Sequence, residues 1–123
     1  MTDEKSLELI QSLHRRTLQN KVAWVAGTND RTFTTSFGDF KLEIQMTPDR
    51  DYQDEPDYAV VIRDANGSEI ETISNVTLRP MMDRTTAEGL SPYAVLEETF
   101  KVARRKALGF DKALDLILSE LKK

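Results

Sequence analysis

The chain has 123 residues, of which 39% are hydrophobic and 31% are charged, and its formal net charge is −4. This composition is not typical of a disordered chain, and the acidic balance argues against a general binder of nucleic acid or anionic membranes, because those partners attract basic surfaces. Cysteine is absent, which excludes disulfides, thiol catalysis and thiolate metal sites. The length suits one core, so we predict a single α+β domain over residues 1–123.

The first predicted element is an amphipathic helix near the N-terminus. Leucine and isoleucine recur at near-helical spacing from Leu7 to Leu18, with polar residues between them. Thr2 is a candidate N-cap, and Asn20-Lys21 ends the helix. The N-terminus lacks an unbroken apolar core, and no window approaches the apolar length of a membrane span, so we expect a cytoplasmic protein with no membrane partner.

Three strand-like segments follow, over residues 22–26, 32–37 and 40–47. The second and third alternate apolar and polar side chains, which is typical of strands with one face in water. The connections around Gly27 and Gly38 are made of turn formers and are short enough to require antiparallel neighbours. The first segment surrounds Trp24, which we predict to be an anchor of the core.

A hairpin is predicted from residue 58 to residue 73. Residues 58–62 are apolar on both strand faces, which favours a strand inside the sheet rather than at its edge. Asn66-Gly67 separates this run from a second strand beginning at Glu69 and predicts a tight turn with positive φ at both residues. The segments together predict an antiparallel meander sheet of about five strands.

The C-terminal third predicts two helices. Residues 74–90 have no convincing period and are expected to form an irregular connection that crosses the sheet. Ser91-Pro92 has the residue types of an N-cap and a first helical position, and Gly109 is a candidate C-terminal stop. Asp111 is the expected cap of the last helix. The predicted fold is therefore α+β, with the N-terminal helix and two C-terminal helices packed on the sheet.

Several motifs resemble those of a scattered group of small bacterial proteins without an assigned activity. They are K-x-x-W from Lys21 to Trp24, the Asn-Gly hairpin, and A-R-R-x-A-L-G-x-D from Ala103 to Asp111. The resemblance spans most of the chain and implies an order of helix, sheet and helices. It implies no functional residue.

Catalytic and metal motifs are weak. His14 is the only histidine and has no nucleophile or carboxylate near it in the sequence, so we expect an ordinary surface or boundary residue. The acidic run at residues 49–57 does not match a calcium loop, because Asp54 takes the place of the central glycine and Val60 that of the last glutamate. We predict no catalytic residue, no metal site and no cofactor. An enzyme with a site assembled from scattered residues is kept as an alternative.

A basic helix face is the second alternative. Lys101, Arg104 and Arg105 share one face, with Lys106 adjacent, and could contact phosphates. Glutamates one turn upstream can pair with them, so we favour a solvated face. A nucleic-acid-associated accessory protein that uses the face from Lys101 to Lys106 is the corresponding alternative.

The preferred hypothesis is a non-catalytic interaction protein that acts through a surface or as a homodimer. Ala59 and Val61 interrupt an otherwise polar second face of the sheet and could be covered by a helix or a second copy. One sheet face absorbs about two helices, so the third must cross over or dock on a partner. The candidate interaction surface therefore comprises Ala59, Val61, Lys101, Arg104 and Arg105, and a closed dimer is the simplest assembly.

Overall fold

The computed structural model describes residues 3–27, 29, 31–47, 56–81 and 89–123. Its centre is an open antiparallel sheet with five strands in the order β1-β2-β3-β4-β5. The strands are β1 (Val25–Ala26), β2 (Thr32–Phe37), β3 (Phe40–Thr47), β4 (Asp57–Arg63) and β5 (Glu69–Ser74). This meander confirms the predicted sheet, and β4 lies inside it as expected, between β3 and β5.

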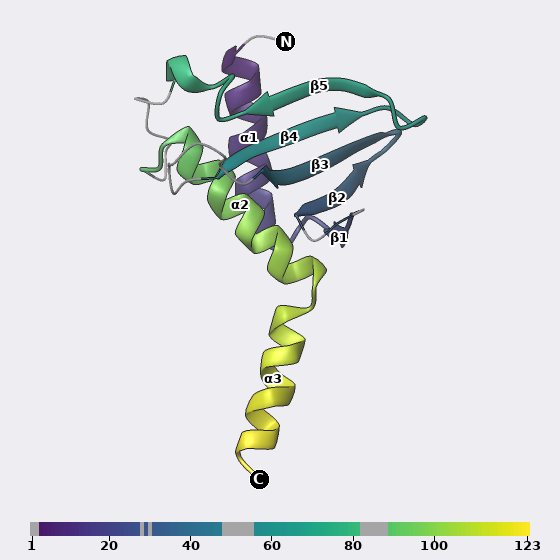
Figure 1. The fold of residues 1–123 in the computed structure, drawn as a ribbon, viewed down its shortest axis with the longest axis vertical. Coiled ribbons are helices and arrows are strands. Elements are labelled where there is room, and N and C mark those ends of the chain that lie inside the picture. The colour runs from purple at the N-terminus through teal and green to yellow at the C-terminus, as the bar shows by residue number, and fades with distance from the viewer. Residues whose placement is uncertain (1–2, 28, 30, 48–55, 82–88) are drawn as a thin grey trace.

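The helices are α1 (Asp3–Leu18), η1 (Arg79–Met81), α2 (Pro92–Ala107) and α3 (Phe110–Leu121). The predicted α+β class, with one N-terminal and two C-terminal helices, is confirmed (Figure 1). Thr2 and the acidic residues 49–55 lie outside the described residues, so the cap and loop proposed there are untested. Among the described helices, none is both long and apolar enough to cross a bilayer.

One face of the sheet carries the core. The strand register places Phe33, Ile44, Val60 and Ile73 in one row across β2, β3, β4 and β5, and each is at most 1% exposed. The Phe100 ring of α2 lies 5.5 Å from the ring of Phe33, which puts α2 over this row. Ile10 and Leu13 of α1 belong to the same buried cluster. Burial of these side chains is the main force that holds both helices on this face.

Trp24 is part of this core, as predicted, with only 5% of its surface exposed. Its indole N–H donates to the hydroxyl of Thr17 at 3.1 Å, which satisfies a polar group that burial would otherwise penalise. The surrounding strand is shorter than predicted, because only Val25–Ala26 pairs with β2. Residues 22–24 do not pair with β2, and the side chains of Val22 and Trp24 lie toward α1.

The hairpin between β4 and β5 differs from the predicted turn. Gly67 has a φ of 85°, whereas Asn66 is not in the left-handed region, so the prediction of positive φ at both residues is wrong. The reason is Asp64, whose carboxylate accepts the N–H groups of Asn66 and Ser68 at 2.9 and 3.0 Å. Gly67 N–H also donates to the Asp64 carbonyl. These bonds close a four-residue turn that needs only one left-handed residue.

The observed helix ends agree with the predicted ones, with one exception at the start of α3. Ser91 caps α2 by accepting the N–H of Ala94 at 3.2 Å, as predicted. Asn20, with a φ of 65°, ends α1, and Lys21 N–H donates back to the Arg16 carbonyl at 2.9 Å. The expected cap at Asp111 is wrong, because α3 begins at Phe110 directly after Gly109.

The described part of the connection after β5 consists of turns and the short η1, in line with the predicted irregular segment, and it buries Leu78 and Met81 in the core. One expectation about packing is wrong. The last helix was expected to pack on the sheet. Instead α3 projects away from it and has no buried residue (Figure 1).

Candidate interaction site

The junction between α2 and α3 is held by backbone and side-chain contacts. Gly109 has a φ of 68°, a conformation that glycine adopts without strain. Gly109 N–H donates to the Lys106 carbonyl, and Ala113 N–H donates to the Gly109 carbonyl, so the two helices share the turn residue. The Arg105 guanidinium lies 5.3 Å from the centre of the Phe110 ring, a cation–π contact across the turn. These contacts define the direction in which α3 leaves the body.

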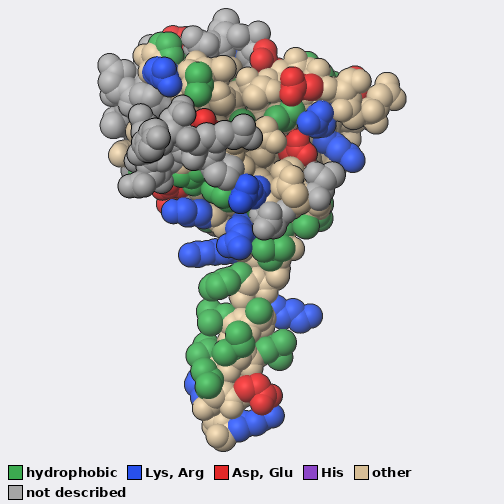
Figure 2. Space-filling model, in the orientation of Figure 1, with side chains coloured by type: hydrophobic (Ala, Val, Ile, Leu, Met, Phe, Trp, Pro, Cys, Tyr) green, Lys and Arg blue, Asp and Glu red, His purple; other side chains and the backbone are tan. Residues whose placement is uncertain are grey.

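Apolar side chains line one side of α3. We call the following residues the α3 stripe: Phe110, Leu114, Ile117, Leu118 and Leu121. Their spacing of i, i+4, i+7, i+8 and i+11 puts them on one helix face, and their exposed fractions run from 41% to 75%. Figure 2 shows hydrophobic side chains gathered along α3. Leu116 is also exposed but lies on the opposite, polar face.

Leaving an apolar stripe of this kind exposed to water is unfavourable in free energy. Burying one large apolar side chain stabilises a fold by about 1.5–3 kcal/mol, and a contiguous exposed apolar patch marks an interaction surface. A lone helix of about 12 residues is also marginal in water, because most helix stability in proteins comes from packing. The α3 stripe is therefore the strongest candidate for a binding surface.

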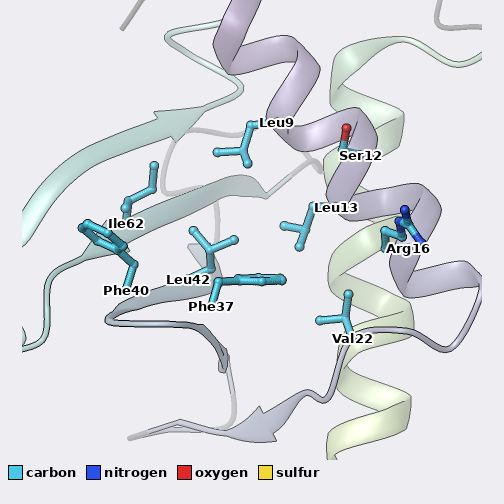
Figure 3. Close-up of a pocket in the computed structure, with 9 residues that line it drawn as sticks. All are labelled: Leu9, Ser12, Leu13, Arg16, Val22, Phe37, Phe40, Leu42 and Ile62. Atoms are coloured by element: carbon cyan, nitrogen blue, oxygen red, sulfur yellow. The ribbon is translucent and has the colours of Figure 1, made fainter.

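The body of the protein carries an apolar groove between α1 and the β2–β3 hairpin (Figure 3). It has a volume of about 330 Å³. We call it the α1–hairpin groove, and its lining residues are Leu9, Ser12, Leu13, Arg16, Val22, Phe37, Phe40, Leu42 and Ile62. Ser12 and Arg16 are the polar members of this set, and the others offer hydrocarbon or aromatic surface.

The strand register explains why this groove exists. Phe37 pairs with Phe40 at the hairpin end, and Leu42 pairs with Ile62 in a neighbouring row of the same sheet face. This is the face that carries the core, so the groove continues the core beyond the part that α1 and α2 cover. Phe37 and Phe40 are consequently half-exposed, at 49% and 50%.

His14 corrects a prediction. It was expected at the surface or a boundary, but only 2% of it is exposed, and its Nε2 lies 2.7 Å from Oε1 of Glu98. The pair joins α1 to α2, and Glu98 is half-exposed. Neither residue lines the α1–hairpin groove. The burial arises because His14 follows Leu13 on the side of α1 that faces α2, which periodicity alone did not separate from the solvent side.

The basic face on α2 is mostly engaged within the chain. Lys101 lies 3.7 Å from the carboxylate of Glu97, Arg105 lies over Phe110, and Lys106 hydrogen-bonds to Asn20. The pairing of Lys101 with an upstream glutamate follows the predicted spacing. Such exposed pairs contribute little to stability.

A hollow of about 280 Å³ adjoins this face, and three cationic side chains line it: Arg31, Lys101 and Arg104. The buried Tyr58 and Phe100 also line it. Burial, and next the nearby Glu97 carboxylate, raise the pKa of Tyr58 above its ordinary value. The phenol therefore stays protonated here and can donate a hydrogen bond.

The two sheet residues of the predicted surface differ in exposure. Val61 is only 1% exposed, whereas Ala59 is half-buried. Glu43 lies opposite Val61 in the register and pairs with Arg63 at 3.1 Å on the same face. A partner that docked on this face would therefore meet mainly the side chains that surround Val61. Helix α2 covers the other side of the sheet. The structure therefore does not bring Ala59 and Val61 together with the basic face of α2.

Within the described ranges, no three side chains of histidine, aspartate or glutamate gather in a way that could hold a metal ion. No family model, no curated protein and no solved structure matches this chain. The resemblance to a group of small bacterial proteins therefore stays a prediction.

Proposed function

We propose that this chain is a non-catalytic interaction protein of the cytoplasm, and that it binds a protein partner or a second copy through α3. The α3 stripe is the observation that carries the proposal, since five apolar side chains on one helix face are at least 41% exposed. A docking role accounts both for this exposure and for the persistence of a short helix outside the core. The packed position of His14 between α1 and α2 favours a structural role for that residue.

Site-specific photo-crosslinking in living cells tests this proposal. A benzophenone amino acid replaces Leu114 on the stripe or, as a matched control, Leu116 on the polar face of the same helix. We expect protein adducts from position 114 and few from position 116, because only the stripe faces a partner. The mass of the adduct identifies a second copy or another protein. Equal labelling from the two positions, or no adduct from position 114, contradicts the proposal.

The hollow lined by Arg31, Lys101 and Arg104 favours a second candidate function, contact with the phosphates of a nucleic acid. Such contacts give an affinity that falls steeply with salt. We expect Arg104→Glu to weaken the binding of a fluorescent single-stranded RNA, and Lys112→Glu on α3 to leave it unchanged. Binding that is insensitive to salt, or equally affected by both changes, rules out this site.

A further inference from the structure

We infer that two copies of this chain exchange α3 reciprocally, so that each α3 stripe fills the α1–hairpin groove of the other copy. This inference rests on the proposed docking role of α3 and names its partner. In the part of the chain that the structure describes, α3 presents an exposed apolar face and the body presents an apolar groove, and these two surfaces can form a single contact. A two-fold axis then satisfies both halves in both chains and closes the assembly.

The two surfaces match in size and chemistry. A volume of about 330 Å³ is at the small end of binding pockets and suits a few side chains of one helix. The half-exposed rings of Phe37 and Phe40 offer the groove's most accessible apolar surface. Arg16 is the charged residue of the groove, and Asp111 with Asp115 lies along one edge of the α3 stripe. Opposite charges therefore flank the apolar contact and can set its direction.

The α2–α3 junction favours a second copy over the chain's own groove. In the structure α3 extends away from the sheet and α1 (Figure 1). Turning it back onto its own body would change the turn at Gly109 and separate Arg105 from the Phe110 ring, 5.3 Å away. A second copy receives α3 as it stands, with these contacts intact.

Buried area favours a reciprocal contact over a single one. Each stripe side chain exposes on the order of 100 Å², so the five together bring about 500 Å² to one contact, and the groove adds a smaller area. Stable interfaces bury about 1,200–2,000 Å². One contact alone is therefore too small, whereas two reciprocal contacts reach about 1,200 Å², the lower end of this range.

Sedimentation equilibrium of the full chain and four variants tests the exchange. Leu114→Glu places a charge on the stripe, and Leu116→Glu makes the same change on the polar face. Phe40→Glu places a charge in the groove, and Ile70→Glu changes an equally exposed apolar residue elsewhere on the sheet, 53% against 50% exposed. We expect the parent and both controls to be dimers. Leu114→Glu and Phe40→Glu should each raise the dissociation constant by about tenfold or more, because a charge must lose its water on association.

Each alternative assembly gives a different result. A parent chain that is monomeric at high micromolar concentration overturns the inference. A dimer that Leu114→Glu breaks and Phe40→Glu leaves intact means that α3 pairs with α3, which also overturns it. Far-UV circular dichroism checks that each variant is folded, and Phe40→Ser replaces Phe40→Glu where the charge unfolds the chain. A monomeric parent whose position 114 crosslinks to another protein in cells keeps the proposed function and rejects only the exchange.

Discussion

Replacing Trp24 by alanine should lower the free energy of unfolding by about 3–5 kcal/mol, the usual cost of removing a large buried aromatic side chain. Trp24 is 5% exposed and lies between the end of α1 and the sheet, so the cavity left behind cannot fill with solvent at no cost. A domain of this size has a total stability of about 5–15 kcal/mol, so this one change removes a large share.

The hydrogen bond to Thr17 is a separable part of this loss. Thr17→Val keeps the volume of the side chain and leaves the indole N–H without its acceptor, 3.1 Å away in the native protein. Thr17 is fully buried, so the loss should be about 1–3 kcal/mol, the cost of an unsatisfied buried donor. The two single variants and the double variant form a cycle in which the effects should not add, because they share one contact.

Urea unfolding followed by far-UV circular dichroism measures these values. Fluorescence is unsuitable, because Trp24 is the only tryptophan. Val25→Ala is the matched control: Val25 is the next residue and is 56% exposed, so its loss should stay within about 0.5 kcal/mol. A loss below about 1 kcal/mol for Trp24→Ala would refute the assignment of Trp24 as a core anchor.

Three further predictions concern the hairpin, Tyr58 and the His14 pair. Gly67→Ala should cost about 1–2 kcal/mol in urea unfolding because φ is 85°, whereas Asn66→Ala should be nearly neutral; equal effects would contradict the turn. Because the pKa of Tyr58 is raised in the folded protein, its phenol stays protonated at pH values at which the same group ionises in the unfolded chain. The free energy of unfolding should therefore fall as the pH rises above about 10.0, and Tyr58→Phe should lessen the fall. Glu98→Ala should cost about 1 kcal/mol by leaving the buried His14 ring without its partner, and an unchanged melting temperature would contradict this.

The strands with one solvent-exposed face were predicted most accurately. The bounds of β2 and β3 agree with the alternation of side chains at residues 32–37 and 40–47, because that pattern specifies a register as well as an element. The turn at Asn66-Gly67 was predicted from two residues, while Asp64, outside that pair, decides its geometry. Local propensity is a weak guide where a side chain from a neighbouring position supplies the hydrogen bonds.

Only part of the interaction site could be predicted from the sequence. Four residues of the α3 stripe, Leu114, Ile117, Leu118 and Leu121, recur at helical spacing in the sequence, and the surplus of apolar helix faces over sheet area predicts that one helix crosses over or docks on a partner. Which helix that is depends on Gly109, whose turn directs α3 away from the sheet. The α1–hairpin groove was not foreseen, because its lining comes from α1, Val22, the β2–β3 hairpin and β4. The adjacent Phe37 and Phe40, on either side of a Gly-Asp turn, were the signal that could have indicated it.

Amide hydrogen exchange of the full chain tests the docking of α3 most directly. A free helix of this length opens readily, so lasting protection of residues 113–121 requires a packed partner. At high micromolar concentration we expect protection in α3 and around the Phe37–Phe40 turn, lost together on dilution and in Leu114→Glu but not in Leu116→Glu. Exchange of the α3 amides at the unprotected rate at every concentration would contradict the docking of α3 on a second copy.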